Sequence, residues 1–428
     1  MARLKRRDFL ITSTWAATGA AAVARGGVSP NEVVRVAVLG CGRGGSLARM
    51  FSKVPDSQVV AICDVDESRS ATLCNAIEKG FGKRPEQVVD FRTLLDRDDI
   101  DALAVATPEH WHAPVTILAC MAGKDVYVEK PCSHTIFEGR QMIRAAERFG
   151  RIVQHGTQLR SVPHYEEAWQ QLRDGVIGDI KMVKAINNQR RRTYKHLSNE
   201  SPPAGVHFDL WLGPAPQRPF NRNRFHGVWR WYWDYGGGDI TNDGVHQIDI
   251  GRWALDLGAP NAVSCSAAKL GSQGDPQETP DTMVVTWEYD DLLYVYEQRD
   301  FTPYRMRGHR QDNDNIIYGT DGFMMVDRAG YRVFYKDRAG PTAGKPWQES
   351  EHFYQNFIDC VKSRKREDQI ADIQEGHLSS LLCHLANISY RTGRRLEFDA
   401  DSETFRHDDD ANQYVSKEYR KGFELPKI

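Results

Sequence analysis

The stretch that decides the fold is Val33-Val34-Arg35-Val36-Ala37-Val38-Leu39-Gly40-Cys41-Gly42-Arg43-Gly44-Gly45. Its apolar first half predicts a buried strand, and the residues from Ser46 to Lys53 have helical character, so the glycines form the turn between them. Such a turn brings backbone N–H groups at a helix N-terminus close to a pyrophosphate. We therefore expect a dinucleotide-binding α/β unit with Gly40, Gly42, Arg43 and Gly45 at the cofactor.

A second apolar run, Gln58 to Cys63, ends in Asp64. A carboxylate at this place accepts hydrogen bonds from the adenosine ribose hydroxyls and repels a 2′-phosphate. Asp66 adds to the repulsion, whereas Arg43 and Arg69 would weaken it. The pattern indicates NAD rather than NADP as the cofactor.

Strand and helix patterns continue to alternate along the next ninety residues or so, with strands over 101–107, 126–128 and 152–154 and helices over 114–122 and 136–149. This alternation predicts a doubly wound parallel sheet of the α/β class, spanning residues 31–154. Ligands of such sheets bind at the carboxyl ends of the strands. Two motifs fall there and give four more candidate cofactor residues: Thr107, His112, Glu129 and Lys130.

The chain has 428 residues, which is about three times the usual domain size, so a second domain is expected over 155–398, followed by a tail over 399–428. Alternating runs over 282–289 and 292–298 flank Asp290-Asp291 and predict a hairpin. Further short strands are expected over 316–319, 323–326 and 331–335, and helices over 349–364 and 373–392. The polar tail from Ala400 is expected to lie over the surface.

The composition excludes several classes of protein. Lys and Arg number 56 against 58 Asp and Glu, so the net charge of −2 gives no attraction for nucleic acid or for an anionic membrane. An aromatic content of 10% argues against disorder. The eight Cys are too sparse for a disulfide-stapled scaffold and contain no C-x-x-C pair, so no metal site is expected.

Residues 1–30 have the order of an export signal: a basic segment, Met1 to Arg7, then an Ala-rich apolar segment, Phe9 to Ala24. The pair Arg6-Arg7 resembles the twin-arginine motif, whose route carries folded proteins. The apolar segment is short for a membrane span. We expect a periplasmic or otherwise exported protein that is cleaved after Ala24 and then has no membrane anchor. An ordinary secretory signal or an uncleaved anchor remains the alternative.

The glycine turn, Asp64, the Thr107–His112 motif and Glu129-Lys130-Pro131 together resemble the Gfo/Idh/MocA oxidoreductase family, as does Gly236-Gly237-Gly238 followed by His246. This family includes glucose–fructose oxidoreductase and inositol dehydrogenase. The resemblance covers residues 31–398. It implies a C-terminal α+β domain with a large, mostly antiparallel open sheet, a sugar or polyol substrate, and a homo-oligomer, either dimer or tetramer.

The resemblance also implies catalytic roles. Lys130 would hydrogen-bond and polarise the substrate hydroxyl, and His246 would accept its proton. Where the family pattern has an Asp, four residues before the His, this chain has Asn242, which cannot take a proton. Asp243 and Asp249 each lie three residues from His246 on a helix, and either could orient the imidazole. We favour Asp249, although ordinary surface charge explains both residues equally well.

Further substrate contacts are expected from Gln158 and Arg160, just after the last strand of the first sheet, and from Asp243. The residues Trp229, Trp231 and Trp233 alternate with polar residues, as in an extended segment with one aromatic face that stacks on a sugar ring. Packing in the core or in an oligomer interface is the other interpretation of these Trp residues.

Export and NAD chemistry constrain each other, because no free NAD pool is expected outside the cytoplasm. Our first hypothesis is an NAD-dependent sugar or polyol oxidoreductase that keeps its cofactor tightly bound and recycles it internally. The alternative is redox-neutral glycoside cleavage through transient oxidation at C3. A non-catalytic sugar sensor is a second alternative, but a binding module needs neither Lys130 nor His246.

Overall fold

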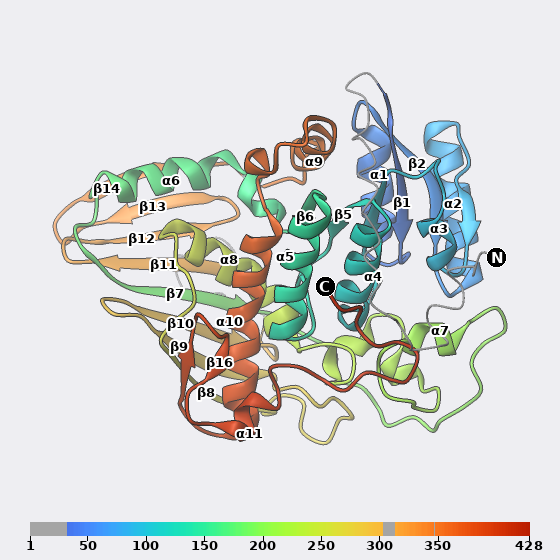
Figure 1. Ribbon diagram of the computed structural model, residues 1–428. Coiled ribbons are helices and arrows are strands. Elements are labelled where there is room, and N and C mark those ends of the chain that lie inside the picture. Colours follow the sequence, from blue (N-terminus) through green and yellow to red (C-terminus); the bar gives the residue numbers. More distant parts are fainter. Residues whose placement is uncertain (1–31, 303–312, 346) are drawn as a thin grey trace.

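The computed structural model describes residues 32–302, 313–345 and 347–428, so the expected export signal lies outside the described residues. Two sheets lie side by side, one in the N-terminal and one in the C-terminal part of the chain (Figure 1). Helix α10 (Ile373–Thr392) runs between them and packs on α5 (Ile136–Phe149) of the first part and β8 (Ala262–Ala268) of the second. The fold class expected from the sequence is confirmed.

The first sheet is parallel throughout. Its strand order is β3 (Glu86–Val88), β2 (Ser57–Cys63), β1 (Val34–Leu39), β4 (Ala102–Val105), β5 (Asp125–Val128) and β6 (Val153–His155). Helices cover both faces of this sheet, so the side chains of its central strands are buried on either side. These strands are therefore continuous apolar runs. The remaining helices of this part are α1 (Gly44–Lys53), α2 (Glu67–Phe81), α3 (Arg92–Leu95) and α4 (Glu109–Met121). Helix α4 begins five residues before the expected Pro114, and strand β3 was too short to be predicted.

The second sheet has the order β14 (Ala339–Ala343), β13 (Gly330–Phe334), β12 (Phe323–Asp327), β11 (Asn313–Gly319), β7 (Ile180–Asn188), β10 (Leu293–Arg299), β9 (Thr282–Glu288), β8, β15 (Leu396–Asp399) and β16 (Thr404–Phe405). Its neighbours pair antiparallel except β10 and β7, which are parallel. The β9–β10 hairpin at Asp290-Asp291 is confirmed. The sequence did not predict β7, β8 or β14 to β16.

Three helices cover one face of the second sheet: α6 (Pro163–Arg173), α8 (Val245–Ala254) and α10. Helix α9 (His352–Ser363) returns to the first sheet, where Phe357 packs edge-on against Phe51 at 5.9 Å between ring centroids. The short elements are α7 (Phe208–Leu212), α11 (Asp409–Asn412), η2 (Gln158–Ser161), η3 (Arg222–Arg224), η4 (Val228–Trp231), the π-helical turn η5 (Ile240–Gly244) and η6 (Arg366–Asp368).

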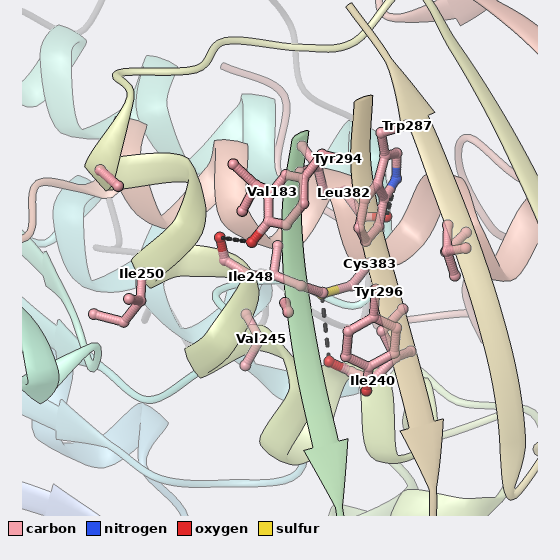
Figure 2. Close-up of a cluster of buried hydrophobic side chains, with 14 of the residues drawn as sticks. Val183, Ile240, Val245, Ile248, Ile250, Trp287, Tyr294, Tyr296, Leu382 and Cys383 are labelled. Carbon is pink, nitrogen blue, oxygen red and sulfur yellow. Dashed lines mark hydrogen bonds between the residues drawn. The ribbon is translucent and has the colours of Figure 1, made fainter. Parts of the chain in front are cut away.

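The core of the second part fixes the position of η5 and α8. Figure 2 shows side chains from these elements packed between the sheet and α10. Tyr294 donates to the carbonyl of Ile248 at 2.9 Å, and Cys383 to that of Ile240 at 3.4 Å. Gly244 is required here, because a Cβ would lie 2.3 Å from the hydroxyl of Tyr296. The residues that η5 and α8 carry are therefore held rigidly.

The segment from 190 to 235 leaves the second sheet and folds under the first one (Figure 1). It contains a separate buried aromatic cluster that includes Trp211, Trp229 and Tyr235. The expected extended run of alternating Trp residues is wrong, because Val228 to Trp231 forms the 3₁₀ turn η4. Packing in a core, the other interpretation, holds for Trp229 and Trp231, which are both more than 90% buried.

The C-terminal residues cross from the second sheet to α4 of the first, seen as the dark red trace in Figure 1. Phe423 and Leu425 pack against the core on that side of the first sheet. None of the helices in the described ranges is both long and apolar enough to span a bilayer.

Candidate functional site

A pocket opens at the carboxyl ends of β1, β2, β4 and β5, where the sequence predicted the cofactor. One wall is the first sheet with its glycine turn, and the other is the 190–235 segment with η5. The lining residues discussed below are Gly40, Gly42, Arg43, Asp64, Arg69, Thr107, Glu109, Trp111, His112, Glu129, Lys130, Leu210, Trp211, His226, Gly227, Trp229, Arg230 and Asn242.

The glycine turn leaves space for a ligand at its backbone. Gly40 has φ +87°, and a Cβ there would lie 2.5 Å from the carbonyl oxygen of Ala106, so only glycine fits. At Gly42, in contrast, a Cβ would meet no protein atom within 4 Å. The open space lies where a dinucleotide's phosphates approach the turn, which fits a bound NAD.

Asp64 stands at the end of β2 with its carboxylate fixed by the backbone. Its oxygens accept from the N–H of Cys41 at 2.6 Å and from that of Asp66 at 2.9 Å. A carboxylate has further lone pairs for ribose hydroxyls. Arg69 lies 2.7 Å from His226, and His226 in turn lies 2.8 Å from Asp66. Arg69, one of the two arginines expected to weaken the preference for NAD, is thus engaged with His226.

Arg43 and Glu129 meet beside the glycine turn. The Nε of Arg43 donates to Glu129 at 3.1 Å, and its guanidinium also binds Glu349 at 3.2 Å. Gln158 donates to Glu129 at 3.1 Å and to the hydroxyl of Tyr127 at 2.7 Å. Gln158 thus lies behind Glu129 and is not among the pocket-lining residues, so it is not placed to contact substrate as expected.

Thr107 and His112 lie on the pocket wall with different partners. The Oγ1 of Thr107 is buried and has no hydrogen-bond partner among the described residues, which makes it available to a bound cofactor. His112 places its ring nitrogens 2.7 Å from the carbonyl of Pro131 and 2.9 Å from that of Thr107. Its ring therefore connects the loop at Thr107 to the loop at Pro131. Gly45 lies within α1, where an added Cβ would first meet the side chain of Leu73.

Lys130 follows the end of β5 and lines the pocket, and its peptide bond to Pro131 is cis. Its Nζ donates to the backbone carbonyl of Asn242 and lies 3.5 Å from the amide oxygen of the same residue. Enclosure by protein lowers the pKa of Lys130, although the carboxylates of Asp243 and Glu129 oppose this effect. The amine is thus held at the point where the two domains meet.

The side-chain amide of Asn242 is oriented from both sides by hydrogen bonds. Its Nδ2 donates to Asp239 at 2.9 Å, and its Oδ1 accepts from the Nε of Arg230 at 2.9 Å. Asp239 also accepts from Arg191 at 2.6 Å. An aspartate at position 242 would bring a second carboxylate against Asp239, whereas the amide supplies a donor there. The amide at position 242 thus suits the carboxylate of Asp239 beside it.

His246 lies on α8, one helical turn after Asn242, and is not among the residues that line the pocket. Enclosure by protein, together with the charge of Lys130, lowers the pKa of His246 well below its usual value, so the ring is neutral at pH 7. Its Nδ1 is buried without a hydrogen-bond partner in the described part of the chain. A neutral imidazole can accept a proton.

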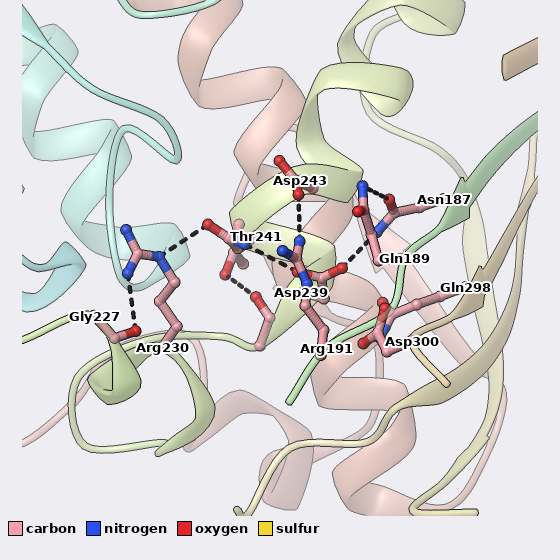
Figure 3. Close-up of polar contacts among 12 residues, drawn as sticks. Asn187, Gln189, Arg191, Gly227, Arg230, Asp239, Thr241, Asp243, Gln298 and Asp300 are labelled. Carbon is pink, nitrogen blue, oxygen red and sulfur yellow. Dashed lines mark hydrogen bonds and ion pairs between the residues drawn. The ribbon is translucent and has the colours of Figure 1, made fainter. Parts of the chain in front are cut away.

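The expectation that Asp249 orients His246 is wrong. Both oxygens of Asp249 accept from Arg160, at 2.8 and 2.9 Å, and one also accepts from Ser379 at 2.7 Å. Asp243 is paired instead with Arg191 (Figure 3). Arg160 is therefore the ion-pair partner of Asp249 and is not among the pocket-lining residues, and its expected contact with substrate stays a prediction.

Trp233 and Asp243, two further candidates for substrate binding, are not among the pocket-lining residues. Trp233 lies next to Tyr390, with 6.4 Å between ring centroids, and under the guanidinium of Arg391 at 5.2 Å. It thus packs on α10, away from the pocket.

Sequence reasoning missed the role of Glu109, which is only 1% exposed and lies at the start of α4. It accepts from the hydroxyl of Thr241 at 3.0 Å and from the N–H of Gly237 at 3.1 Å. Burial raises the pKa of Glu109 to about 7, against the opposing effects of Thr241 and the Lys130 charge. A carboxyl group directly after the Thr-Pro pair at a strand end was the available signal.

No group of three or more His, Cys, Asp or Glu side chains in the described residues is arranged to hold a metal ion.

Two family models match the chain over nearly its whole described length. Residues 34–157 match the Gfo/Idh/MocA model of the oxidoreductase family, NAD-binding Rossmann fold. Residues 188–425 match the model of the oxidoreductase family, C-terminal alpha/beta domain.

Curated relatives match over shorter stretches. A glycosyl hydrolase family 109 protein of Solibacter usitatus is 32% identical over 45% of this chain and 48% of its own length. Another from Saccharopolyspora erythraea is 33% identical over 35% of this chain and 34% of its own. An alpha-N-acetylgalactosaminidase of Shewanella oneidensis is 39% identical over 27% of each. Each match covers less than half of the relative.

Solved structures resemble the whole fold. The WlbA dehydrogenase of Bordetella pertussis, in complex with NADH and UDP-GlcNAcA, has a TM-score of 0.64 at 20% identity and covers 86% of this chain and 99% of its own. The aldose-aldose oxidoreductase of Caulobacter crescentus, complexed with glycerol, has a TM-score of 0.65 at 18% identity and covers 86% and 100%. These likenesses show a shared fold.

Proposed function

This chain belongs to the Gfo/Idh/MocA oxidoreductase family, and on that premise we propose that it oxidises a secondary hydroxyl of a sugar or polyol with NAD. The observation that carries the proposal is the position of Lys130. Its amine lies in the same pocket as the glycine turn and the carboxylate of Asp64, and it contacts Asn242 from the C-terminal part of the chain.

NAD, when bound, supplies the hydride acceptor of the reaction. Lys130 would donate a hydrogen bond to the substrate hydroxyl and polarise it. His246 is neutral and would accept the hydroxyl proton as the hydride leaves. Glu109, with a pKa of about 7, lies close enough to Lys130 for their charges to interact, and can hold a proton at neutral pH.

Asn242 and Arg230 would position these groups without transferring a proton. The amide oxygen of Asn242 lies between the two cations, Lys130 and Arg230, and limits the approach of one to the other. Arg230 also donates to the carbonyl of Gly227 at 2.9 Å, so its guanidinium is fixed at the pocket wall. Fixed donors of this kind need no rearrangement as charge develops on the substrate oxygen.

A second candidate function is redox-neutral glycoside cleavage, which the names of the glycosyl hydrolase family 109 relatives favour. In this scheme oxidation at C3 acidifies the C2–H, a base removes that proton, and the glycosidic oxygen leaves. Water then adds, and C3 is reduced again, so no net redox change results. The scheme needs a proton acceptor and a proton donor besides Lys130, and His246 and Glu109 are available for these roles.

We further propose that the protein is exported and recycles its NAD without release, as its N-terminal sequence indicates. Such an enzyme would couple the oxidation of one sugar to the reduction of another, or carry out the redox-neutral reaction. Both schemes need slow cofactor exchange.

One screen tests the proposal and separates the two functions. The purified protein is mixed with sugars, polyols and aryl glycosides, while reduction of the bound cofactor and release of the aglycone are both recorded. Reduction by a free sugar or polyol is expected. Aglycone release without net reduction would establish the second function instead. Sugar binding with neither signal would show a sensor and contradict both.

A further inference from the structure

We infer that the segment Gly205–Arg230, called the cover here, closes the adenosine half of the pocket and makes the cofactor captive. We also infer that Lys417–Phe423, called the strap, fastens the cover. This inference rests on the proposed function in one respect only, that NAD occupies the pocket. It assigns cofactor retention to residues of the C-terminal domain and tail.

The cover is joined to the first domain directly after the ribose-binding carboxylate. The N–H of Glu67 donates to the carbonyl of Gly205 at 3.0 Å, and the N–H of His207 to that of Val65 at 2.9 Å. Val206 and Asp66 form an antiparallel bridge. The backbone of the cover thus continues the loop that carries Asp64, and the two cannot separate without losing these bonds.

Side chains complete this connection at the pocket itself. His226 of the cover lies 2.8 Å from Asp66 and 2.7 Å from Arg69, two residues of the first domain. Both His226 and Arg69 line the pocket. A dinucleotide whose ribose reached Asp64 would therefore have a side-chain contact between the two domains next to it.

The cover is a packed unit and not a loose loop. Trp211 stacks on Phe208 at 5.6 Å between ring centroids and meets Tyr235 at 4.8 Å. Both Trp211 and Tyr235 are at least 95% buried. Because local opening would expose this aromatic cluster to water, opening costs free energy.

The strap fastens the cover from outside. Arg420 donates to the backbone carbonyls of Gly213 at 2.7 Å and Asp209 at 2.8 Å, and it pairs with the Asp209 carboxylate. Its own N–H donates to the carbonyl of Pro214 at 3.1 Å. In Figure 1 the dark red strap passes beside α7 before it turns toward α4.

Trp111 connects the strap to the inside of the pocket. It lines the pocket, and its Nε1 donates to the carbonyl of Trp211 at 3.0 Å. Phe423 of the strap packs edge-on against it at 5.8 Å. A Cβ on Gly213 would lie 2.0 Å from the indole of Trp111, so the backbone of the cover packs directly against this ring.

The other end of the strap is anchored in the first domain. Lys417 pairs with Glu138 at 2.8 Å, and the side chain of Glu138 is fully buried. Tyr419 donates to the same carboxylate at 3.2 Å. The strap thus joins α5 to the cover and holds it against the adenosine half of the pocket, which gives slow release of NAD.

The experiment measures exchange of bound NAD against isotopically labelled NAD in the full chain. The wild type should retain NAD through gel filtration. Arg420→Ala and Phe423→Ala loosen the strap, and His226→Ala removes the contact at the pocket. Each should exchange NAD about tenfold faster or more, the effect expected for a lost charge-assisted hydrogen bond or a buried aromatic ring. Arg394→Ala, which breaks an exposed Arg–Asp pair outside the strap, should leave the exchange rate unchanged.

Near-ultraviolet circular dichroism with saturating NAD establishes that each variant is folded. Folded variants that all exchange NAD at the wild-type rate would overturn the inference, as would a wild type that loses NAD within one gel filtration. A freely exchanging protein that still oxidises sugars would overturn the inference and the proposed retention of NAD, and would keep the proposed oxidation of a sugar or polyol. Tightly retained NAD that no sugar reduces would keep the inference and overturn the proposed function.

Discussion

Glu109 shows how enclosure changes the chemistry of a common side chain. Its carboxyl group has two hydrogen-bond donors, Thr241 and Gly237, and two cations in its surroundings, Lys130 and Arg230. Desolvation outweighs all of them, so the pKa rises to about 7. A group with such a pKa in the pocket can exchange a proton during turnover at neutral pH.

This raised pKa gives a prediction on stability. A carboxyl whose pKa is raised on folding binds more protons in the folded state, so the free energy of unfolding falls as the pH rises from about 4.5 to about 7. Glu109→Gln should remove this dependence. Relative to the wild type, its stability should improve by roughly 2–4 kcal/mol between pH 4.5 and pH 8.

Urea denaturation at the two pH values measures the difference. Glu166→Gln, on the exposed side of α6, is the matched control and should follow the wild type. Equal pH dependence in the wild type and in Glu109→Gln would show that folding does not raise the pKa of Glu109.

Residue spacing predicted some of the site and misassigned the rest. Lys130 and His246 were found because both belong to motifs at the ends of elements. Asp249 was assigned to His246 from its helical spacing, but Arg160 reaches it from η2, 89 residues earlier in the chain. A contact between residues so far apart cannot be read from local spacing.

Among the elements, the strand–turn–helix from Val34 to Lys53 was predictable because a buried strand, a glycine turn and a helix each leave a local pattern. The cover was not. Its aromatic residues alternate in sequence, but Val228 to Trp231 forms a 3₁₀ turn whose rings pack inward. Tertiary packing, and not backbone periodicity, decides the structure of that segment.

The glycine turn gives a prediction that separates folding from cofactor binding. Gly42→Ala places a methyl group where no protein atom lies within 4 Å, so the apo-protein should keep its melting temperature. The methyl group would occupy the space of the pyrophosphate, so the Kd for NAD should rise about tenfold or more. Gly40→Ala should instead destabilise the fold, because of its φ of +87° and the carbonyl of Ala106.

Calorimetry of NAD binding and thermal melts of the apo-proteins give both quantities. Gly80→Ala on α2, which also meets no atom within 4 Å, is the control: it should leave the NAD affinity unchanged, and its melting temperature should not fall, because alanine favours a helix over glycine. Wild-type NAD affinity in Gly42→Ala would exclude the turn as the phosphate site.

For the whole molecule, the two sheets differ in how they are covered. The first has helices on both faces, whereas α6, α8 and α10 cover one face of the second. On its other face, Val284 is 49% exposed on β9 and Leu293 is 45% exposed on β10. We propose that this face forms the subunit contact of the homo-oligomer expected from the sequence.

We predict that the double variant Val284→Lys, Leu293→Lys is monomeric, because each change introduces charge into a surface that excludes water on association. Light scattering after gel filtration measures the mass of the particle. Leu197→Lys, an exposed leucine in the 190–235 segment, should keep the wild-type mass. An unchanged mass in the double variant would place the subunit contact elsewhere.

The measurement that tests the central claim most directly is the reduction of protein-bound NAD by an active sugar or polyol in a single turnover, in the wild type and in Lys130→Met. We predict that Lys130→Met retains NAD but reduces it about 10²–10⁴ times more slowly, the usual contribution of a positioned acid–base group. Reduction at the wild-type rate in this variant would contradict the assignment of Lys130 to the reaction centre.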